Sequence, residues 1–307
     1  MVTVRIQGGI GNQLFQIAAG FFVAKNNSAG ELTLDATRVA FGTDRTRRLE
    51  ALNFDLLPSD FGIRIEGVKA YYFTNLRPAR LGSILALSIS RLNDALKRRD
   101  HMIFDETLGS VHLPDLKSKT ILHGYFNDFN IVQQAENFGF SRNLHLSTES
   151  SPWLNGMMSK MNFGECIAIH VRLGDYLRFP HIFGTISEDF YFRCLEHMNF
   201  KSRDEIAIFS DEPNRVANLF PRISALPNVM IIRQPKISPS FETLYLMSQF
   251  RKLICANSTF SMWAAWFNDH SAGQRKLVTV PSPYLLNQPD MKTPVAWIKV
   301  AREGLKG

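Results

Sequence analysis

The chain has 307 residues, 45% of them hydrophobic and 21% charged, which fits a globular protein of one large or, as the better expectation, two medium domains. Its apolar stretches fall short of the roughly 20 residues that a membrane span needs, and its three cysteines form an odd set without metal-ligand spacing. No signal peptide is visible, so we expect a cytoplasmic protein. The formal net charge of +7 favours anionic partners: nucleotides, phosphorylated lipids, a membrane surface or nucleic acid.

The N-terminal half begins with a pattern of strand, glycine turn and helix. Residues 2–7 predict a first strand, a turn follows at residues 8–11, and apolar residues then recur at helical spacing. Residues 31–35 predict a second strand, and residues 121–125 a later one. This half is therefore expected to open as a β-α-β unit.

A helix with basic ends is predicted between residues 77 and 100. Its arginines and lysines would meet anionic lipid headgroups or an anionic acceptor. A packed helix with a solvated basic end is the alternative reading of the same residues.

The C-terminal half is more regular, and we place the domain boundary in the loop-like stretch at residues 147–152. The predicted domains are residues 1–150 and residues 151–307. Strands alternating with amphipathic helices indicate a parallel sheet covered on both faces. The predicted strands are residues 166–170, 205–210, 228–233, 252–256 and 276–280, and the predicted helices are residues 187–198, 213–220, 240–250 and 261–267.

The heptapeptide at residues 170–176 directly follows a buried strand, a place where α/β enzymes bind ligands. Arg172 offers planar, bidentate recognition of phosphate, and Gly174 lets the backbone turn or approach a ligand. Each residue alone is more simply read as a hydrogen-bonded histidine, a surface ion pair or a turn, but together they favour a phosphate-bearing substrate. The candidates in this motif are His170, Arg172, Gly174, Asp175 and Tyr176.

Two further strand ends carry polar side chains. Three hydroxyls after the strand at 252–256 exceed what a helix N-cap requires and predict an anion cradle. After the strand at 205–210, Asp211 is read either as an acceptor for a ribose or guanine edge or as the cap of the next helix. The candidates are Ser210, Asp211, Asn257, Ser258, Thr259, Phe260 and Ser261, whereas Trp263 and Trp266 are expected in the core.

The N-terminal glycine loop matches the dinucleotide fingerprint only in part, because Leu14 stands where its third glycine belongs. Asp35, at the end of the second strand, keeps a dinucleotide-dependent oxidoreductase as a weak alternative. Amide donors beside the glycines at a helix N-terminus suggest another anion site. The candidates here are Gly9, Gly11, Asn12 and Gln13.

Neither a D-x-D triplet nor a histidine pair with metal-ligand spacing occurs. We therefore expect a site without metal or other cofactor, in which Arg172 and helix N-termini supply the positive potential.

Four segments, at residues 8–16, 170–176, 209–211 and 257–261, together resemble the bacterial α-1,2-fucosyltransferases of glycosyltransferase family 11. The resemblance implies a glycosyltransferase-B fold of two Rossmann-like domains facing a cleft, GDP-β-L-fucose as co-substrate, and inversion at the anomeric carbon. It implies that Arg172 binds the donor phosphates, that His170 lies near the nucleotide, and that Asn12 approaches the reacting sugar or phosphate. Ser258 and Thr259 would hold the β-phosphate. The resemblance also implies that the domain at residues 1–150 lies on the acceptor side and that the domain at residues 151–307 binds the GDP-sugar.

Three residues depart from the family pattern: Leu173 replaces a frequent second arginine, Glu212 a frequent aspartate, and Met262 a frequent tryptophan. We expect these side chains to flank the donor site and to affect acceptor choice and donor affinity. Asp175 and Asp211 are the candidates for a catalytic base, and Asp175 is also expected to orient Arg172.

The resemblance thus implies transfer of fucose to the 2-hydroxyl of a galactose-terminated oligosaccharide or lipid-linked glycan such as O-antigen. Peripheral contact with the anionic inner membrane is expected, and no nucleic acid partner, because no basic stripe interleaved with exposed aromatic residues is found. Another GDP-sugar glycosyltransferase is the alternative.

Overall fold

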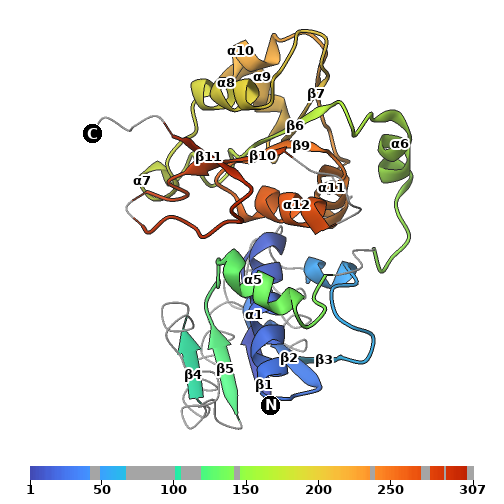
Figure 1. Cartoon of the computed structure of the whole chain (residues 1–307), viewed down its shortest axis with the longest axis vertical. Coiled ribbons are helices and arrows are strands. Elements are labelled where there is room, and N and C mark those ends of the chain that lie inside the picture. Colours follow the sequence, from blue (N-terminus) through green and yellow to red (C-terminus); the bar gives the residue numbers. More distant parts are fainter. Residues whose placement is uncertain are drawn as a thin grey trace, which may run out of the picture. The chain divides into compact units, whose positions relative to one another are not determined.

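The computed structural model describes residues 1–41, 49–66, 101–104, 119–141, 146–235, 239–270, 277–286 and 288–302. The chain divides into two compact units, Met1–Ser147 and Thr148–Gly307, here called unit 1 and unit 2 (Figure 1). The basic helix predicted between residues 77 and 100 lies outside the described residues. The acceptor and donor roles assigned to the two halves stay predictions.

Unit 1 is built on a parallel five-stranded sheet of order β3-β2-β1-β5-β4. Helix α1 is buried over most of its length, since it carries apolar side chains on nearly every side, and it packs against β1, β2 and α5. The elements are β1 (Val2–Arg5), α1 (Ile10–Asn26), β2 (Glu31–Asp35), η1 (Ala36–Phe41), η2 (Glu50–Asn53), β3 (Gly62–Glu66), β4 (His101–Phe104), β5 (Thr120–His123) and α5 (Phe129–Glu136).

The predicted β-α-β opening is confirmed by β1, α1 and β2. Strands β3 and β4 were missed. In β3 the side chains are mostly exposed, so its sequence lacks the apolar run that reveals a buried strand.

Unit 2 is built on a parallel six-stranded sheet of order β11-β10-β9-β6-β7-β8. Helices α8, α9 and α10 lie on one face and α11 and α12 on the other (Figure 1). The strands are β6 (Ile167–Val171), β7 (Ile206–Ser210), β8 (Val229–Ile231), β9 (Lys252–Ile254), β10 (Leu277–Ser282) and β11 (Ile298–Ala301). The helices are α6 (Pro152–Lys160), α7 (Pro180–Phe183), α8 (Glu188–His197), α9 (Pro213–Leu219), α10 (Pro221–Ser224), α11 (Ser240–Ser248) and α12 (Thr259–His270).

The predicted parallel sheet with helices on both faces is confirmed, with ends shifted by one to three residues. Helix α12 starts earlier than predicted, at Thr259, so the hydroxyl-rich segment forms its first turn. Strand β11 and helices α6, α7 and α10 were missed; β11, α7 and α10 have only four residues each, too few to show a periodic pattern.

The core of unit 2 lies on both sides of β6 and β7. Trp263 and Trp266 are buried, as predicted, and the three cysteines are buried free thiols. Within the described ranges, no helix is long and apolar enough to cross a membrane.

Candidate active site

The predicted site residues of unit 2 meet where the order of the strands reverses. From β6 the chain runs outward to β7 and β8, then returns to β9 on the other side of β6 and continues outward to β10. The loops that leave β6 and β9 therefore diverge at the carboxyl edge. Open parallel sheets bind ligands at this topological switch point.

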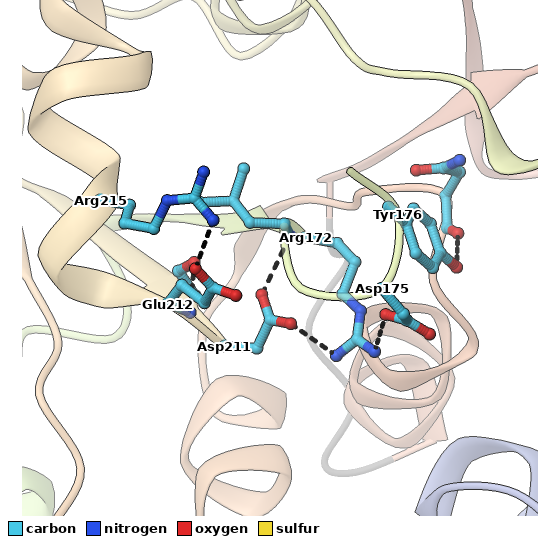
Figure 2. A network of polar contacts seen from close by, with 9 residues as sticks. Arg172, Asp175, Tyr176, Asp211, Glu212 and Arg215 are labelled. Atoms are coloured by element: carbon cyan, nitrogen blue, oxygen red, sulfur yellow. Dashed lines mark hydrogen bonds and ion pairs between the residues drawn. The ribbon is translucent and has the colours of Figure 1, made fainter. Parts of the chain in front are cut away.

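Arg172, on the loop after β6, lies between two carboxylates (Figure 2). Its Nη2 is 2.5 Å from Oδ1 of Asp175, and its Nη1 is 3.1 Å from Oδ2 of Asp211. Its Nε is buried and has no hydrogen-bond partner among the described residues. Because arginine has five N–H donors, the guanidinium keeps donors for a ligand while both acids fix its orientation.

The surroundings of Arg172 keep it charged. Burial lowers the pKa of Arg172, but the carboxylates of Asp211 and Asp175 outweigh burial and raise the pKa above its ordinary value. The Arg172 side chain is 27% exposed, so it is accessible and yet partly withdrawn from water. A partly desolvated cation interacts with an anionic ligand more strongly than an exposed one does.

Asp211 holds the loop after β6 as well as Arg172. Its Oδ1 accepts from the backbone N–H of Leu173 at 2.9 Å, and its Oδ2 pairs with Arg172. Both oxygens are therefore engaged within the protein, and the side chain orients the arginine. The capping alternative for Asp211 is wrong, because the N-cap of α9 is Glu212, and Ser210 Oγ accepts from the Glu212 N–H at 3.1 Å.

Gly174 is required by the close approach of Asp211. A Cβ atom at residue 174 would collide with Oδ2 of Asp211, the oxygen that pairs with Arg172. Any larger residue at this position would displace the carboxylate or the loop. The glycine therefore permits the pairing of Asp211 with Arg172.

His170, the fourth residue of β6, is 4% exposed. The Tyr191 hydroxyl donates to its carbonyl oxygen at 3.0 Å, and its ring lies 5.7 Å from the Phe260 ring, centre to centre. Burial, and then the charge of Arg172, lower the pKa of His170 to about 3. The imidazole is therefore neutral at physiological pH, and its Nδ1 is buried without a hydrogen-bond partner in the described structure.

The segment after β9 is tied to the loop after β6 by hydrogen bonds. The Tyr176 hydroxyl donates to the carbonyl oxygen of Asn257 at 2.6 Å, and the Asn257 amide donates to the carbonyl oxygen of Phe183 at 2.8 Å. The rings of Tyr176 and Phe183 stack with centres 4.3 Å apart. Tyr176 and Asn257 therefore hold the two loops together.

The hydroxyls at the start of α12 do not play equal parts. Ser261 is buried, and its Oγ donates to the backbone carbonyls of Ala256 and Ser258 at 3.4 and 3.2 Å, so it stabilises the turn. Ser258 and Thr259 stand at the first turn of this 12-residue helix. A helix N-terminus carries partial positive charge and exposed N–H groups, which suit a phosphate.

Sequence reasoning missed Phe183 and Tyr284. Tyr284 hydrogen-bonds to the Tyr176 side chain and to the Thr259 backbone, and its N–H donates to Asp290 at 2.9 Å. Nothing in the spacing of the sequence connects Tyr284 with the segment at residues 170–176. Only the sheet brings these segments together.

The expectation that three substituted side chains flank the donor site is wrong for two of them. The side chains of Leu173 and Met262 are 2% and 0% exposed and belong to the core, so they do not face a ligand. Glu212 is partly exposed but pairs with Arg215 at 2.8 Å (Figure 2).

The remaining predicted residues lie in unit 1. Gly9 is the N-cap of α1, and Gly11 is buried within that helix. Gln13 is buried as well: its amide donates to the Gly8 carbonyl at 3.1 Å and accepts from the Ala51 N–H at 3.3 Å. Gln13 thus stabilises the loop between β1 and α1 through bonds to the backbone. Asn12, by contrast, is partly exposed, and its side chain lies next to Gly8.

The ribose-binding role considered for Asp35 finds no support. Its Oδ1 accepts from the Thr37 N–H at 3.1 Å, and its Oδ2 lies 3.9 Å from Nε of Arg5. The carboxylate is engaged within unit 1. Among the described residues, no group of three or more acidic, histidine or cysteine side chains is placed to hold a metal ion.

Two α/β units, each built on a parallel sheet, are typical of the glycosyltransferase-B fold, and the candidate site lies at the switch point of the second. The crystal structure of the fucosyltransferase NodZ from Bradyrhizobium has a similar fold, with a TM-score of 0.52 at 14% identity over 86% of this chain and 92% of that one. The sequence profile of glycosyl transferase family 11 matches residues 86–293, and the chain belongs to this family.

Two curated relatives from Escherichia coli match along almost their whole length. The O-antigen biosynthesis glycosyltransferase WbnK is 24% identical over 96% of this chain and 99% of its own. An alpha-1,2-colitosyltransferase is 23% identical over 98% of this chain and 99% of its own. The chain is therefore a glycosyltransferase.

Proposed function

We propose that this chain is an inverting, metal-independent fucosyltransferase that transfers L-fucose from GDP-β-L-fucose to the 2-hydroxyl of a galactoside in a surface glycan such as O-antigen. The observation that carries the proposal is Arg172, held by two carboxylates at the switch point of unit 2. The names of the two relatives, which include O-antigen biosynthesis and an α-1,2 linkage, support the kind of product.

The chemistry follows from where charge develops. The acceptor hydroxyl oxygen forms a bond to the fucose anomeric carbon, the bond from that carbon to the β-phosphate oxygen breaks, and the electron pair remains on the departing GDP. The fucosyl ring is cation-like in the transition state, while the phosphate gains negative charge. Preorganised donors aimed at that phosphate lower the barrier.

Arg172 supplies such donors, because Asp211 and Asp175 hold its guanidinium in place before the ligand arrives. Ser258 and Thr259, with the N-terminus of α12, would bind the other phosphate oxygens. His170 is neutral and buried beside Phe260. It would face the nucleotide without adding a second positive charge next to Arg172.

Of the two candidate bases, Asp175 fits the role better than Asp211. The Asp175 side chain is 48% exposed, whereas that of Asp211 is 10% exposed and has both oxygens engaged. Asp175 contacts Arg172 through Oδ1, whereas Asp211 uses Oδ2 for Arg172 and Oδ1 for the Leu173 N–H, so a proton on Asp211 would disturb the loop as well as the arginine. We therefore assign Asp211 as a positioning residue.

The colitosyltransferase relative favours one second candidate, in which the same site transfers a different sugar, colitose. The phosphate contacts would be identical, because they involve only the nucleotide portion of the donor. The two candidates differ only in the sugar that they place beside the phosphate.

A peripheral position at the inner membrane, with a lipid-linked glycan as acceptor, belongs to the same proposal. The net charge of +7 supports attraction to an anionic lipid surface.

The experiment combines ligand binding with transfer. Thermal-shift measurements with GDP, UDP, NAD and a short oligonucleotide come first, and we expect GDP alone to stabilise the chain strongly. Incubation of GDP-fucose with a panel of galactosides, without added metal and with EDTA, is expected to release GDP and give a 2-linked fucoside. Stabilisation by NAD or the oligonucleotide but not by GDP would refute the proposal.

A further inference from the structure

Arg302, the residue after β11, joins two segments that lie beside the candidate site. Its Nη1 donates to the carbonyl oxygens of Pro283 and Tyr284 at 3.4 and 3.2 Å, and its Nη2 donates to that of Thr185 at 3.3 Å. Pro283 and Tyr284 belong to the loop after β10, whereas Thr185 follows α7. Within the described part of the chain, the guanidinium donates only to backbone carbonyls and pairs with no carboxylate. Arg302 therefore cross-links backbone segments.

Gly184 gives the guanidinium of Arg302 room to approach. It is the C-cap of α7 and has a φ of 67°, a conformation that glycine adopts without strain. A Cβ atom at residue 184 would collide with Nη2 of Arg302. Gly174 makes room in the same way for Oδ2 of Asp211. In both places a glycine lets a charged side chain come close to the backbone of a loop.

Phe183 connects the segment that Arg302 holds with the site. Its ring stacks on the Tyr176 ring with centres 4.3 Å apart, and its carbonyl oxygen accepts from the Asn257 amide at 2.8 Å. The Tyr176 hydroxyl donates to the Asn257 carbonyl at 2.6 Å, and Cζ of Arg172 lies over the Tyr176 ring, 5.4 Å from its centre. A displacement of Phe183 would therefore reach both Arg172 and the segment before α12.

The second segment held by Arg302 reaches the site through Tyr284. This side chain is buried, and it hydrogen-bonds to the Tyr176 side chain and to the backbone of Thr259, in the first turn of α12. The Tyr284 N–H donates to Asp290 at 2.9 Å, and its carbonyl oxygen accepts from Arg302. Both segments that Arg302 joins thus contact Tyr176.

We propose that Arg302 is a positioning residue of the candidate active site. By fixing the segments at residues 183–185 and 283–284, it holds Tyr176, and through it Arg172 and the start of α12, in the arrangement that binds a diphosphate. A binding constellation keeps its geometry only when the residues behind it are themselves fixed. The identity of the diphosphate, that of GDP, rests on the proposed function, whereas the positioning role rests on the contacts of Arg302, Phe183 and Tyr284.

Hydrogen–deuterium exchange without nucleotide tests the positioning itself. Arg302→Met should speed exchange in peptides that cover residues 172–185 and 255–261 and should leave α9 unchanged. Arg193→Met is the matched control, because Arg193 donates to the carbonyl oxygen of the neighbouring Ala301 at 3.0 Å and so ties β11 to α8. Wild-type exchange in both peptides of Arg302→Met would overturn the inference. Equal acceleration in α9 would overturn it as well, since it would show a general loss of stability.

Calorimetric titration of GDP and GMP measures the consequence for binding. The three distances from Arg302 are at the long end of the hydrogen-bond range, so each bond is weak. We expect Arg302→Met to weaken GDP binding about fivefold, the equivalent of one hydrogen bond, and GMP binding less. A structural residue without a positioning role would change the unfolding temperature but not the ratio of the two affinities. An unchanged ratio in folded Arg302→Met would overturn the inference.

Arg302→Lys separates geometry from charge. Lysine keeps the positive charge, but its compact ammonium does not reproduce the fork that spans two segments. The GDP affinity of Arg302→Lys should therefore lie closer to that of Arg302→Met than to that of the wild type. Full wild-type affinity would overturn the inference, because charge alone would then suffice. A wild type that does not bind GDP would refute the proposed function, and the exchange comparison, made without nucleotide, would still decide the role of Arg302.

Discussion

Each unit places an arginine at the switch point of its sheet, and the two arginines differ in what surrounds them. Arg5, the last residue of β1, is 3% exposed and lies 3.9 Å from Asp35 and 3.4 Å from Nδ1 of His123. Arg172, just after β6, is 27% exposed and is held by Asp175 and Asp211. Arg5 thus spans three neighbouring strands from inside unit 1, whereas Arg172 faces outward.

The comparison teaches that position in the fold does not by itself make an arginine functional. A buried guanidinium with partners on both sides stabilises the sheet, while a guanidinium that is 27% exposed and held in place by two carboxylates keeps N–H donors for an anion. The edge of unit 1 therefore holds an arginine that serves the structure, and the edge of unit 2 holds an arginine that is accessible to a ligand.

The largest expected effect is on Arg172. Arg172→Ala should lower kcat by at least about 10²-fold, the usual loss when one transition-state donor is removed. Arg215→Ala is the matched control, because Arg215 pairs with Glu212 beside the site but is 51% exposed. GDP release measured at saturating GDP-fucose tests this. Turnover close to wild type in Arg172→Ala would remove the distinction between the two edges.

A smaller effect is expected for the arginine of unit 1, and on a different quantity. Arg5→Met should lower the free energy of unfolding by about 2 kcal/mol, because it leaves the partners of a buried cation unpaired. Urea denaturation gives this value. The affinity for GDP should not change, and a selective loss of GDP binding in a stably folded Arg5→Met would show that the N-terminal edge also contacts the nucleotide.

A third effect concerns His170 and appears only when the pH is lowered. Burial and Arg172 lower its pKa from 6.5 to about 3, so the folded chain keeps it neutral while the unfolded chain protonates it below pH 6.5. The contribution of the neutral His170 to the free energy of unfolding is therefore fully present above pH 6.5 and is lost as the pH falls towards 3. In His170→Gln the unfolding free energy should decline less steeply between pH 6.5 and 4.5. Equal slopes would mean that His170 is protonated in the folded state.

The sequence predicted the fold of unit 2 well because its strands are apolar runs separated by amphipathic helices. It predicted unit 1 less completely. Strand β3 carries Ile63 and Ile65 at 38% and 40% exposure, together with charged neighbours, and so lacks the signature of a buried strand. Short or half-exposed elements are defined by their neighbours in the sheet, which a single sequence does not reveal.

The candidate site was likewise predicted only in part. Arg172, Asp175 and Asp211 were found because polar residues directly after apolar strands share one edge of a parallel sheet. The separate tasks of Ser261 and Gln13, which bond to the backbone, were not visible, because a hydroxyl or amide looks the same whether it binds a ligand or closes a turn.

The most direct test of the central claim is a calorimetric titration of GDP and GMP into the wild type and Arg172→Ala. If Arg172 and the start of α12 hold the β-phosphate, the wild type should bind GDP at least about tenfold more tightly than GMP, and Arg172→Ala should lose most of that difference. Equal affinities for GDP and GMP in the wild type, or a preference that survives in Arg172→Ala, would contradict the account.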